Sequence, residues 1–498
     1  MAGSVSMVVI DQTIVSLALP SIQRSLNMTE TQMLWVINAY VLAMASLVAI
    51  GGRLGDLFGR TTLFRIGALA FVGGSALAGV ATAAWWIIGA RVIEGAGAAI
   101  MLPASSAIIV GSVSTQERGR AFGISTGISM AVLAVGPLLG GFLTQVISWR
   151  AVFFVNVPIG LAVIATTFVA VPTFKGDRGT RIDWLGTGLL VPGIVAVIVG
   201  LMQGAVWGWG SPQLIIMVIA GVVLLVVFVV VEIRQDHPLV DLRLFRIRNF
   251  TGDSAVRALL QFSIVGMLAL SSLWVQDVLD FHPVSAGLSL LPLTVPLVFI
   301  APLAGRLYDR MGPRLLTSAG AASFGLALLW MAAVLSKQSY AWIIPAYLAI
   351  GVGIGFVMVP ITTDALNVVP SARHGQASGV FATMSEMGGA LGLAILGAIV
   401  AVEQEARIDA FLRGAGVSRT DVPGIERFLA ESMKGRPVQT PHGLPPNTFQ
   451  ASASALTSAT SKAYYIAGVV MLAAATIAWV SLRRVHVGDH EVHPVLSP

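Results

Sequence analysis

An eight-residue pattern occurs twice in this chain, and the repeat strongly constrains the fold. Residues 52–59 read Gly-Arg-Leu-Gly-Asp-Leu-Phe-Gly, and residues 305–312 read Gly-Arg-Leu-Tyr-Asp-Arg-Met-Gly. The spacing G-R-L-x-D-x-x-G is therefore kept at an offset of 253 residues (305 − 52). An offset this long means that the duplicated unit holds several hydrophobic segments and fills roughly half of the chain. The repeat predicts two related halves, each built from several helices.

The composition indicates a membrane protein. Hydrophobic residues make up 56% and charged residues 11% of the 498 residues, whereas a soluble protein carries about 25% charged residues. The 30 Lys and Arg residues do not indicate nucleic-acid binding, because they gather in loops on one side of the predicted membrane. The chain has no cysteine, which excludes disulfides and thiolate metal sites.

Apolar runs of about 20 residues, the length that spans a bilayer, predict an all-α integral membrane protein with fourteen transmembrane helices. The runs lie near 4–24, 33–52, 64–83, 86–110, 120–145, 150–171, 184–204, 213–232, 253–275, 286–305, 316–335, 342–363, 376–402 and 464–482. Short cytoplasmic loops accumulate Lys and Arg. The even-numbered loops and the tail hold eighteen of them, and the short loops opposite hold Arg24, Arg150 and Lys337. We therefore expect a multi-pass protein of the cell membrane with both termini in the cytoplasm.

The repeat extends to other segments and predicts the domain organisation. The run Gly119-Arg120-Ala121-Phe122-Gly123 opens the fifth span, and Gly375-Gln376-Ala377-Ser378-Gly379 opens the thirteenth. Span n thus matches span n + 8, which two six-helix units separated by two additional helices satisfy. The expected units are a six-helix bundle at 1–171, two additional helices with cytoplasmic linkers at 172–250, a second six-helix bundle at 251–482, and a cytoplasmic tail at 483–498.

We assign no functional role to two polar segments. A long polar loop at 403–461 is expected on the outer side of the second bundle. The tail contains His486, His490 and His493, a spacing that could chelate a metal. A solvated tail is the commoner case, so no metal and no cofactor is expected.

Motifs in four further places carry a resemblance to a known family. They are Asp11-Gln12-Thr13-Ile14-Val15 in span one, Arg91-x-x-Glu94-Gly95-x-Gly97 in span four, Gly136-Pro137-x-x-Gly140-Gly141 in span five, and Trp149-Arg150 with Asn156 and Gly160 at span six. Together with 52–60 they resemble a fourteen-span member of the major facilitator superfamily, in its drug:proton antiporter group. The resemblance implies alternating access between two pseudo-symmetric bundles, and the span-five motif marks exporters. The chain departs from the family at Glu94, where glutamine is usual.

The duplicated motif is expected to act as a conformational gate. Its residues are Gly52, Asp56, Gly59 and Arg60 in the first copy and Gly305, Asp309 and Gly312 in the second. The glycines permit a tight turn, and Asp56 can accept hydrogen bonds from the amino end of a neighbouring helix. The resemblance implies a latch that holds the two halves together on the cytoplasmic side and breaks in each cycle. An ordinary capped, charged turn is the alternative.

Glycines and proline also shape span five. Pro137 removes a backbone donor, and Gly136, Gly140 and Gly141 lack side chains, so this helix can bend and approach a neighbour closely. Simple close packing is the alternative to a role specific to antiporters.

Ionisable residues inside the predicted spans carry more information, because such groups are costly at bilayer depth. Asp253 and Arg257 are four residues apart and could satisfy each other, which is a structural role. Arg91 and Glu94 share a helix face. They form either a buried ion pair that holds the helix or a pair in which Arg91 changes the proton affinity of Glu94.

Asp11 and Glu386 have no acidic counterpart in the other half of the repeat, where Ile264 and Met130 stand. A proton carrier needs a carboxyl whose proton affinity depends on burial and on the arrival of water or a cation. Asp11 and Glu386 are therefore the first candidates for binding protons or a cationic substrate, followed by Glu94 with Arg91. A structural hydrogen bond is the alternative for each.

The energy source follows by elimination. No lysine follows a glycine, so the chain has no Walker loop, and no His-Glu-x-x-His pattern occurs. The chain is thus expected to be no enzyme, and an ion gradient, most simply of protons, remains. The predicted function is proton-coupled export of amphipathic or cationic drugs by a monomer in the lipid bilayer, without nucleic acid. The alternatives are a dedicated exporter of one endogenous metabolite, antibiotic, siderophore or lipid, and a transport-inactive receptor or membrane enzyme.

Overall fold

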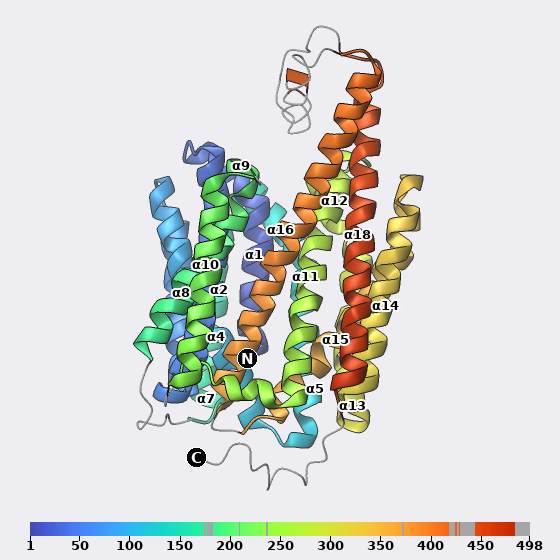
Figure 1. Cartoon of the computed structure of the whole chain (residues 1–498). Coiled ribbons are helices and arrows are strands. Elements are labelled where there is room, and N and C mark those ends of the chain that lie inside the picture. Colours follow the sequence, from blue (N-terminus) through green and yellow to red (C-terminus); the bar gives the residue numbers. More distant parts are fainter. Residues whose placement is uncertain are drawn as a thin grey trace.

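The protein is an elongated bundle of helices that run roughly parallel to one axis (Figure 1). The computed structural model describes residues 1–173, 176, 183–208, 210–235, 238–370, 373–417, 424–425, 428 and 444–483. The helices of the first part are α1 (Ala2–Ser25), α2 (Glu30–Phe58), α3 (Arg60–Gly79), α4 (Ala84–Ser112), α5 (Arg118–Phe142), α6 (Ala151–Phe154), α7 (Asn156–Ala170), α8 (Trp184–Met202), α9 (Gly204–Trp207) and α10 (Pro212–Arg234). They are followed by α11 (Arg248–Asp277), α12 (Pro283–Leu288), α13 (Leu291–Met311), α14 (Pro313–Val334), α15 (Ile344–Asn367), α16 (His374–Gly414) and α18 (Thr448–Ser481).

The predicted all-helical membrane architecture is confirmed, whereas the count of fourteen spans is not. In the described part of the chain, twelve helices are long and apolar enough to cross a membrane, or thirteen if the bent helix α1 is one span. Helix α1 bends by 60° between Ser16 and Ala18, because Pro20 cannot donate a backbone hydrogen bond to the Ser16 carbonyl. The remaining expected span, 120–145, coincides with α5, a helix of 25 residues.

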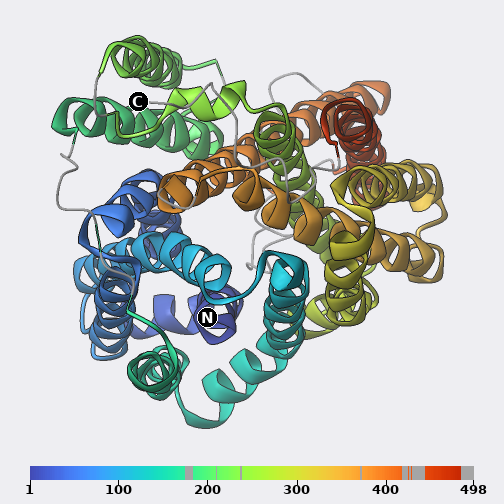
Figure 2. The same cartoon turned by 90° about the horizontal axis from the view of Figure 1, so that it is seen from below.

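The helices contact one another in two sets. Helix α4 packs on α2 and α3, and α1 packs on α5, while α14 packs on α15 and α18, and α11 packs on α16. The two sets meet where α16 crosses α2 and where α5 crosses α13. Seen along the axis, the helices surround a common centre (Figure 2). The proposed domain boundaries stay a prediction.

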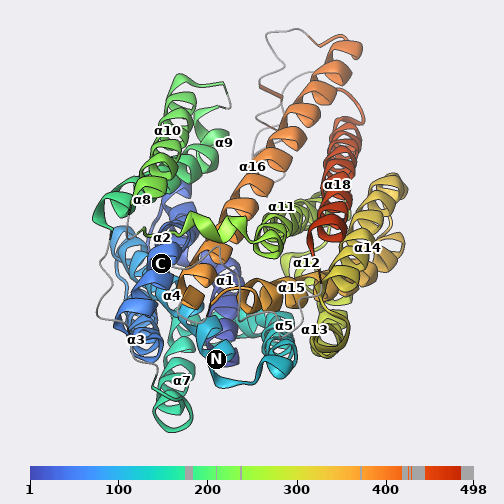
Figure 3. The ribbon, with the colours of Figure 1, turned by 60° about the horizontal axis from the view of Figure 1, so that its bottom comes forward.

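Helices α8 and α10 lie outside these two sets. They pack mainly on each other, and α8 also contacts α2 and α16. The segment that follows α10 runs across one end of the molecule to α11 and includes the short 3₁₀ helix η3 (Leu242–Arg246) (Figure 3). We call residues 238–247 the strap. Leu239 and Leu244 of the strap are at most 1% exposed, so it is packed into the protein core rather than lying free.

The prediction of a polar loop at 403–461 is wrong at both of its ends. Helix α16 continues to Gly414, and α18 already begins at Thr448. Ion pairs one helical turn apart, Glu403 with Arg407 and Asp409 with Arg413, stabilise the polar part of α16. Hydropathy alone reads such charged turns as a loop. Residues 418–423, 426–427 and 429–443 of this segment lie outside the described residues, as does the tail from 484 onward with its three histidines.

Candidate functional site

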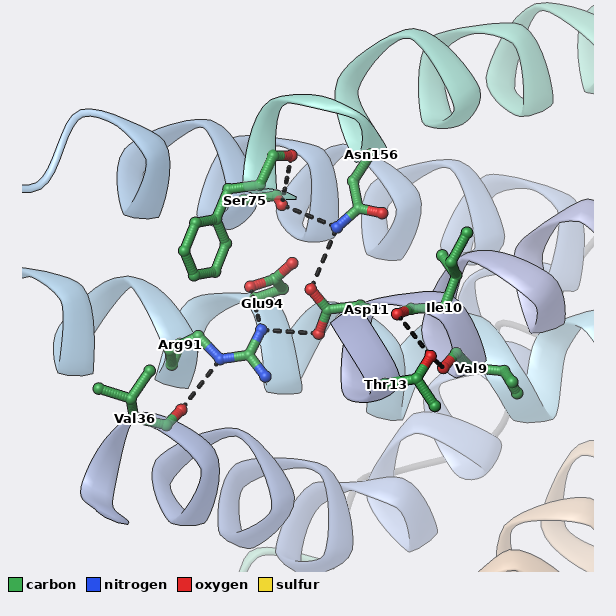
Figure 4. Close-up of polar contacts among 10 residues, drawn as sticks. Val9, Ile10, Asp11, Thr13, Val36, Ser75, Arg91, Glu94 and Asn156 are labelled. Atoms are coloured by element: carbon green, nitrogen blue, oxygen red, sulfur yellow. Dashed lines mark hydrogen bonds and ion pairs between the residues drawn. The ribbon is translucent and has the colours of Figure 1, made fainter. Parts of the chain in front are cut away.

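Asp11 on α1 and the residues Arg91 and Glu94 on α4 form one buried charge cluster (Figure 4). Arg91 Nη1 lies 2.7 Å from Asp11 Oδ2 and 2.7 Å from Glu94 Oε2. The three residues are at most 1% exposed, so water does not screen these ion pairs. The structure thus unites three of the four residues predicted for proton coupling and contains the expected pair of Arg91 with Glu94.

Polar side chains from neighbouring helices orient the Asp11 carboxylate. Asn156 Nδ2 donates a hydrogen bond of 3.1 Å to Asp11 Oδ1 and one of 3.0 Å to Ser75 Oγ. Both Asn156 and Ser75 are fully buried. Asn156 and Arg91 thus give each oxygen of Asp11 a hydrogen-bond donor, and Ser75 holds Asn156 in place.

Two contacts hold the guanidinium group of Arg91. Its Nε donates to the carbonyl oxygen of Val36 at 3.0 Å. Its central carbon lies 4.2 Å from the centre of the Tyr40 ring, a cation–π contact. Arg91 is therefore fixed from α2 as well as from the two carboxylates, and it can stabilise charge without moving.

The cluster holds two acids and one base. Both oxygens of Asp11 accept hydrogen bonds, whereas Glu94 Oε1 has no hydrogen-bond partner among the described residues. A buried carboxylate oxygen without a donor is costly. Glu94 is therefore the member of the cluster whose surroundings suit a bound proton. It stands where the family pattern usually has glutamine, so this cluster has one ionisable group more than the pattern predicts.

The predicted antiporter motif packs against the helix that carries Asp11. A Cβ atom on Gly136 would lie 2.5 Å from Thr13 Oγ1, and one on Gly140 would lie 3.1 Å from Ile14 Cα. The missing side chains thus allow α5 to approach α1 closely. Gly141 does not take part, since a Cβ there would meet nothing within 4 Å. Pro137 lies in the same helix.

Glu386 on α16 lies apart from the cluster. It is partly exposed and makes no hydrogen bond to a described residue. Arg257 of the neighbouring helix α11 lies within electrostatic reach of Glu386 but forms no ion pair with it among the described residues. The guanidinium carbon of Arg257 lies 5.6 Å from the centre of the Phe381 ring. Tyr40 is within electrostatic reach of Glu386 and of the Asp11 cluster. Glu386 is thus an accessible acid inside the bundle.

The predicted mutual pairing of Asp253 and Arg257 is wrong. No ion pair joins them in the described part of the chain, and neither oxygen of Asp253 has a hydrogen-bond partner there. Each lies within electrostatic reach of a group on a different helix. For Arg257 this group is Glu386 of α16, and for Asp253 it is Asp364 of α15. A spacing of four residues permits contact, but these two side chains reach toward different neighbours.

The duplicated motif forms two matching contacts at one end of the molecule, which we call the latch end. In the first latch, Asp56 of α2 accepts hydrogen bonds from the backbone N–H groups of Gly375 (3.2 Å) and Gln376 (2.9 Å) at the start of α16. Arg60 pairs with Asp56 at 3.2 Å. Free N–H groups and the helix dipole favour an anion at this place.

The second latch repeats this geometry. Asp309 of α13 accepts hydrogen bonds of 3.1 Å from the backbone N–H groups of Gly119 and Arg120 at the start of α5. Each latch therefore ties a carboxylate of one predicted half to the amino end of a helix of the other half. That these contacts open and close during transport stays a prediction.

Glycine permits the close approach in both latches. A Cβ on Gly52 would lie 2.3 Å from the Gly375 carbonyl oxygen, and one on Gly305 would lie 2.0 Å from the Gly119 carbonyl oxygen. The turns after the two aspartates also need glycine, because Gly59 has φ +91° and Gly312 has φ +78°. The glycines of the motif thus allow α2 to cross α16 and α13 to cross α5, and they allow the turns that end α2 and α13.

Sequence reasoning did not assign a role to Ser75, Tyr40 or Asn156 in the charge cluster. Asn156 belongs to the motif around span six, and a buried amide in an apolar span is a signal that could have suggested it. Ser75 and Tyr40 give no comparable signal, because single hydroxyl groups are common in spanning helices.

A duplicated helical bundle with charges buried between its helices and with paired contacts at one end is the architecture of a secondary transporter. The Major Facilitator Superfamily model matches residues 1–176 and 165–393, and the chain belongs to this superfamily. It is a family of transporters, not of enzymes, in agreement with the prediction.

The chain is similar to proteins named for drug resistance and export. It is 36% identical over 399 residues to the puromycin resistance protein pur8 of Streptomyces alboniger, which covers 79% of each chain. It is 33% identical over 410 residues to the multidrug resistance protein Stp of Mycobacterium tuberculosis, covering 82% of this chain and 76% of that one. The tetracenomycin C resistance and export protein of Streptomyces glaucescens is 32% identical over 406 residues, or 80% of this chain and 74% of that one. The predicted relation to drug exporters of this superfamily is thereby confirmed.

Solved structures share the fold. The human organic anion transporter MFSD10 superposes with a TM-score of 0.65 at 12% identity, covering 96% of this chain and 97% of the other. The proton:xylose symporter XylE superposes with a TM-score of 0.62 at 13% identity, covering 96% and 94%. At such identities the likeness concerns the fold alone.

Proposed function

We propose that the protein exports amphipathic or cationic drugs in exchange for protons, by alternating access of two six-helix bundles joined through α8 and α10. The relatives named for puromycin resistance, multidrug resistance and tetracenomycin C export support the drug as cargo. The observation that carries the proposal is the buried cluster with two carboxyls on one guanidinium. In our proposal α5 is the fourteenth span, the chain acts as a monomer, and the latch end with both termini faces the cytoplasm.

The excess acid of the cluster provides the coupling chemistry. While Glu94 holds a proton, the cluster is neutral, because Asp11 balances Arg91. When Glu94 releases its proton, the buried cluster carries one negative charge, which is costly in a low-dielectric interior. A cationic compound or water that enters beside the cluster offsets this charge. Drug and proton therefore compete for the same electrostatic environment, which is the requirement for antiport.

Glu386 serves as the accessible acid in this scheme. It has no ion pair in the described part of the chain and lies within electrostatic reach of Arg257 on the neighbouring helix α11. An incoming cation would find in Glu386 a carboxylate with free oxygens. We propose that Glu386 takes part in binding the cationic group of the drug, whereas Glu94 carries the proton.

The test is flux in liposomes that contain a pH-sensitive dye. Under an imposed proton gradient, adding cationic dyes and antibiotics should release protons with the wild type. Glu94→Gln should abolish the release, Asp11→Asn should reduce it, and Glu386→Gln should weaken it most for cationic compounds. Glu405→Gln, which removes an exposed acid from α16, is the matched control. Proton release by Glu94→Gln at the wild-type level would disprove the assignment of Glu94.

A dedicated exporter is the second candidate. Relatives carry names with single compounds, such as puromycin, tetracenomycin C and cephamycin. Resistance profiling of cells with and without the protein separates the two. Protection against one compound class alone would favour the dedicated exporter, and protection against unrelated cationic compounds would favour the drug exporter.

A further inference from the structure

Two buried carboxyl groups lie on neighbouring helices outside the charge cluster. Asp253 of α11 is 0% exposed and Asp364 of α15 is 2% exposed. Neither oxygen of Asp253 makes a hydrogen bond to a described residue. Asn249, one helical turn before Asp253, donates a hydrogen bond of 2.8 Å to Asp364, and α11 packs on α15. The two carboxyls therefore lie at the same level of neighbouring helices, within electrostatic reach of each other.

Donors hold the second acid in place. Tyr308 Oη donates to Asp364 Oδ1 at 3.0 Å, and Asn249 Nδ2 donates to Asp364 Oδ2 at 2.8 Å. The side chain of Asn249 is in turn bonded to the backbone of Arg483. These contacts give Asp364 the donors of a carboxylate, whereas Asp253 has none, which suits the protonated form.

No cation balances the pair among the described residues. Arg257, one turn after Asp253, forms no ion pair among the described residues and lies within electrostatic reach of Glu386 of α16. Arg118 of α5 donates to Asn367 Oδ1 at 2.7 Å, and Arg248 donates to the Val480 carbonyl. Two ionised carboxylates could not stay together in this place, because both would be buried and mutually repulsive.

Hydrogen bonds and neighbouring residues connect the carboxyl pair to the second latch. Tyr308, which binds Asp364, immediately precedes Asp309, the carboxylate of that latch. Asn367 Nδ2 donates to Tyr308 Oη at 3.0 Å, and its partner Arg118 immediately precedes Gly119, whose N–H group binds Asp309. Separation of the carboxyl pair would thus move the residues beside both partners of the second latch.

We propose that Asp253 and Asp364 form a second proton-binding site, which holds one shared proton while the second latch is closed and releases it to water at the latch end when the latch opens. The inference rests on the proposed function, since it supplies the place where the proton of an antiport cycle leaves. One O–H bond of Asp253 breaks, and the proton passes to water. Both carboxylates then repel each other until α11 and α15 separate or a proton returns.

The sign of the pH dependence follows from this scheme. Deprotonation favours separation, so the open fraction at the latch end should rise with pH. For one shared proton, the ratio of open to closed molecules changes at most about tenfold per pH unit. Protonation of Asp309 itself would open the second latch at low pH, so the direction of the response identifies the acid.

A distance reporter tests the proposal without substrate. The chain contains no cysteine, so Gln116→Cys and Met311→Cys, both at exposed positions next to the second latch, allow a pair of spin labels. Labelled protein in lipid nanodiscs is measured from about pH 5.5 to about pH 8.5. The wild type should shift to longer distances as the pH rises, and both Asp253→Asn and Asp364→Asn should remove this shift. Glu405→Gln should keep it.

Folding is checked by thermal unfolding near neutral pH. Asp253→Asn replaces an unpartnered acid with a neutral group of the same size, so its melting temperature should equal or exceed that of the wild type. A wild-type pH shift in both asparagine variants, the absence of any shift in the wild type, or a marked fall in melting temperature for Asp253→Asn would each overturn the proposal.

The reporter and the flux assay fail independently. If proton counterflow occurs but the reporter does not respond to pH, the second proton site is wrong and the antiport proposal stands. If the reporter responds through Asp253 and Asp364 but drugs move no protons, the proposed function is wrong and the carboxyl pair remains a pH-dependent element of the latch end.

Discussion

The two latches have the same sequence pattern and nearly the same backbone geometry, yet their surroundings differ. Both place an aspartate on two N–H groups at a helix start, with distances of 2.9 to 3.2 Å. Asp56 is additionally paired with Arg60, whereas Pro313 stands at the equivalent position after Asp309. Arg53 of the first motif is 8% exposed, while Arg306 of the second is exposed.

The strap explains the difference. The side chain of Gln376 donates to the carbonyl oxygens of Pro238 (3.2 Å) and Leu239 (3.0 Å), and its backbone N–H binds Asp56. Arg373 forms an ion pair with Asp241 of the strap. The second latch has no comparable cover in the described part of the chain. The linker of the two additional helices therefore covers one latch and leaves the other open to solvent.

This asymmetry shows that two copies of one motif can stabilise the closed state by different amounts. We expect the first latch to contribute more to closure, because burial strengthens charge-assisted hydrogen bonds and excludes salt. The second latch, which the strap does not cover, lies beside the Asp253 and Asp364 pair and is the better placed of the two to respond to pH. The following variants, measured with the reporter at Gln116 and Met311, sharpen or break this comparison.

The largest effect is expected where the two latches are alike. Gly52→Ala and Gly305→Ala each place a Cβ at most 2.3 Å from a facing carbonyl oxygen, a backbone clash that no rotamer relieves. Each should destabilise the closed state by about 3 kcal/mol, or roughly a hundredfold in the ratio of open to closed molecules. Gly73→Ala, whose Cβ would meet nothing within 4 Å, is the control. An effect of only one of the two variants would show that only one crossing closes the molecule.

Neutralising the two aspartates should weaken closure by different amounts. Asp56→Asn loses the charge in two hydrogen bonds and in the pair with Arg60, so closure should weaken by about 2 kcal/mol. Asp309→Asn loses the charge in both hydrogen bonds and one of the two acceptor oxygens, at a site that is only partly buried and has no arginine pair, so the effect should be about 1 kcal/mol. The same reporter gives both values. Equal effects would mean that the strap does not strengthen the first latch.

Much of this comparison could be anticipated from the sequence. The repeat itself placed Asp56 at a helix start, because a carboxylate in a glycine-rich turn suits free N–H groups, and the same pattern at Asp309 implied a second site. The pairing of Arg91 with Glu94 followed from a spacing of three residues. These are local features, or features repeated in the chain.

The rest depends on contacts between distant residues. Asp253 and Asp364 lie on different helices and share no motif, so nothing in the sequence pairs them. The sequence predicted only a cytoplasmic linker where the strap lies, and it gave no sign that Leu239 and Leu244 are buried. Arg257 illustrates the converse, because its spacing from Asp253 suggested a pair that its long side chain does not form. Side-chain direction between helices is set by tertiary packing, which hydropathy does not describe.

The strap can be tested at two equivalent positions. Gln376→Leu keeps the backbone N–H on Asp56 but removes both donors to the strap, so closure should weaken by about 1 kcal/mol. Arg120→Leu is the matched variant of the second latch. Its side chain is exposed, so the change should stay within about 0.5 kcal/mol. Similar values for the two variants would remove the strap from the explanation.

Salt should produce the smallest difference. In Asp309→Asn only the first latch keeps its charge, and in Asp56→Asn only the second does. Raising the ionic strength from about 0.05 M to about 0.5 M should leave the closed fraction of the first variant almost unchanged, because Asp56 is buried. In the second variant closure should weaken by a few tenths of a kcal/mol, because the partly exposed carboxylate of Asp309 is screened by salt. A salt response that is larger with Asp56 alone would show that the strap admits ions, and the difference between the latches would then lie in the Arg60 pair and not in burial.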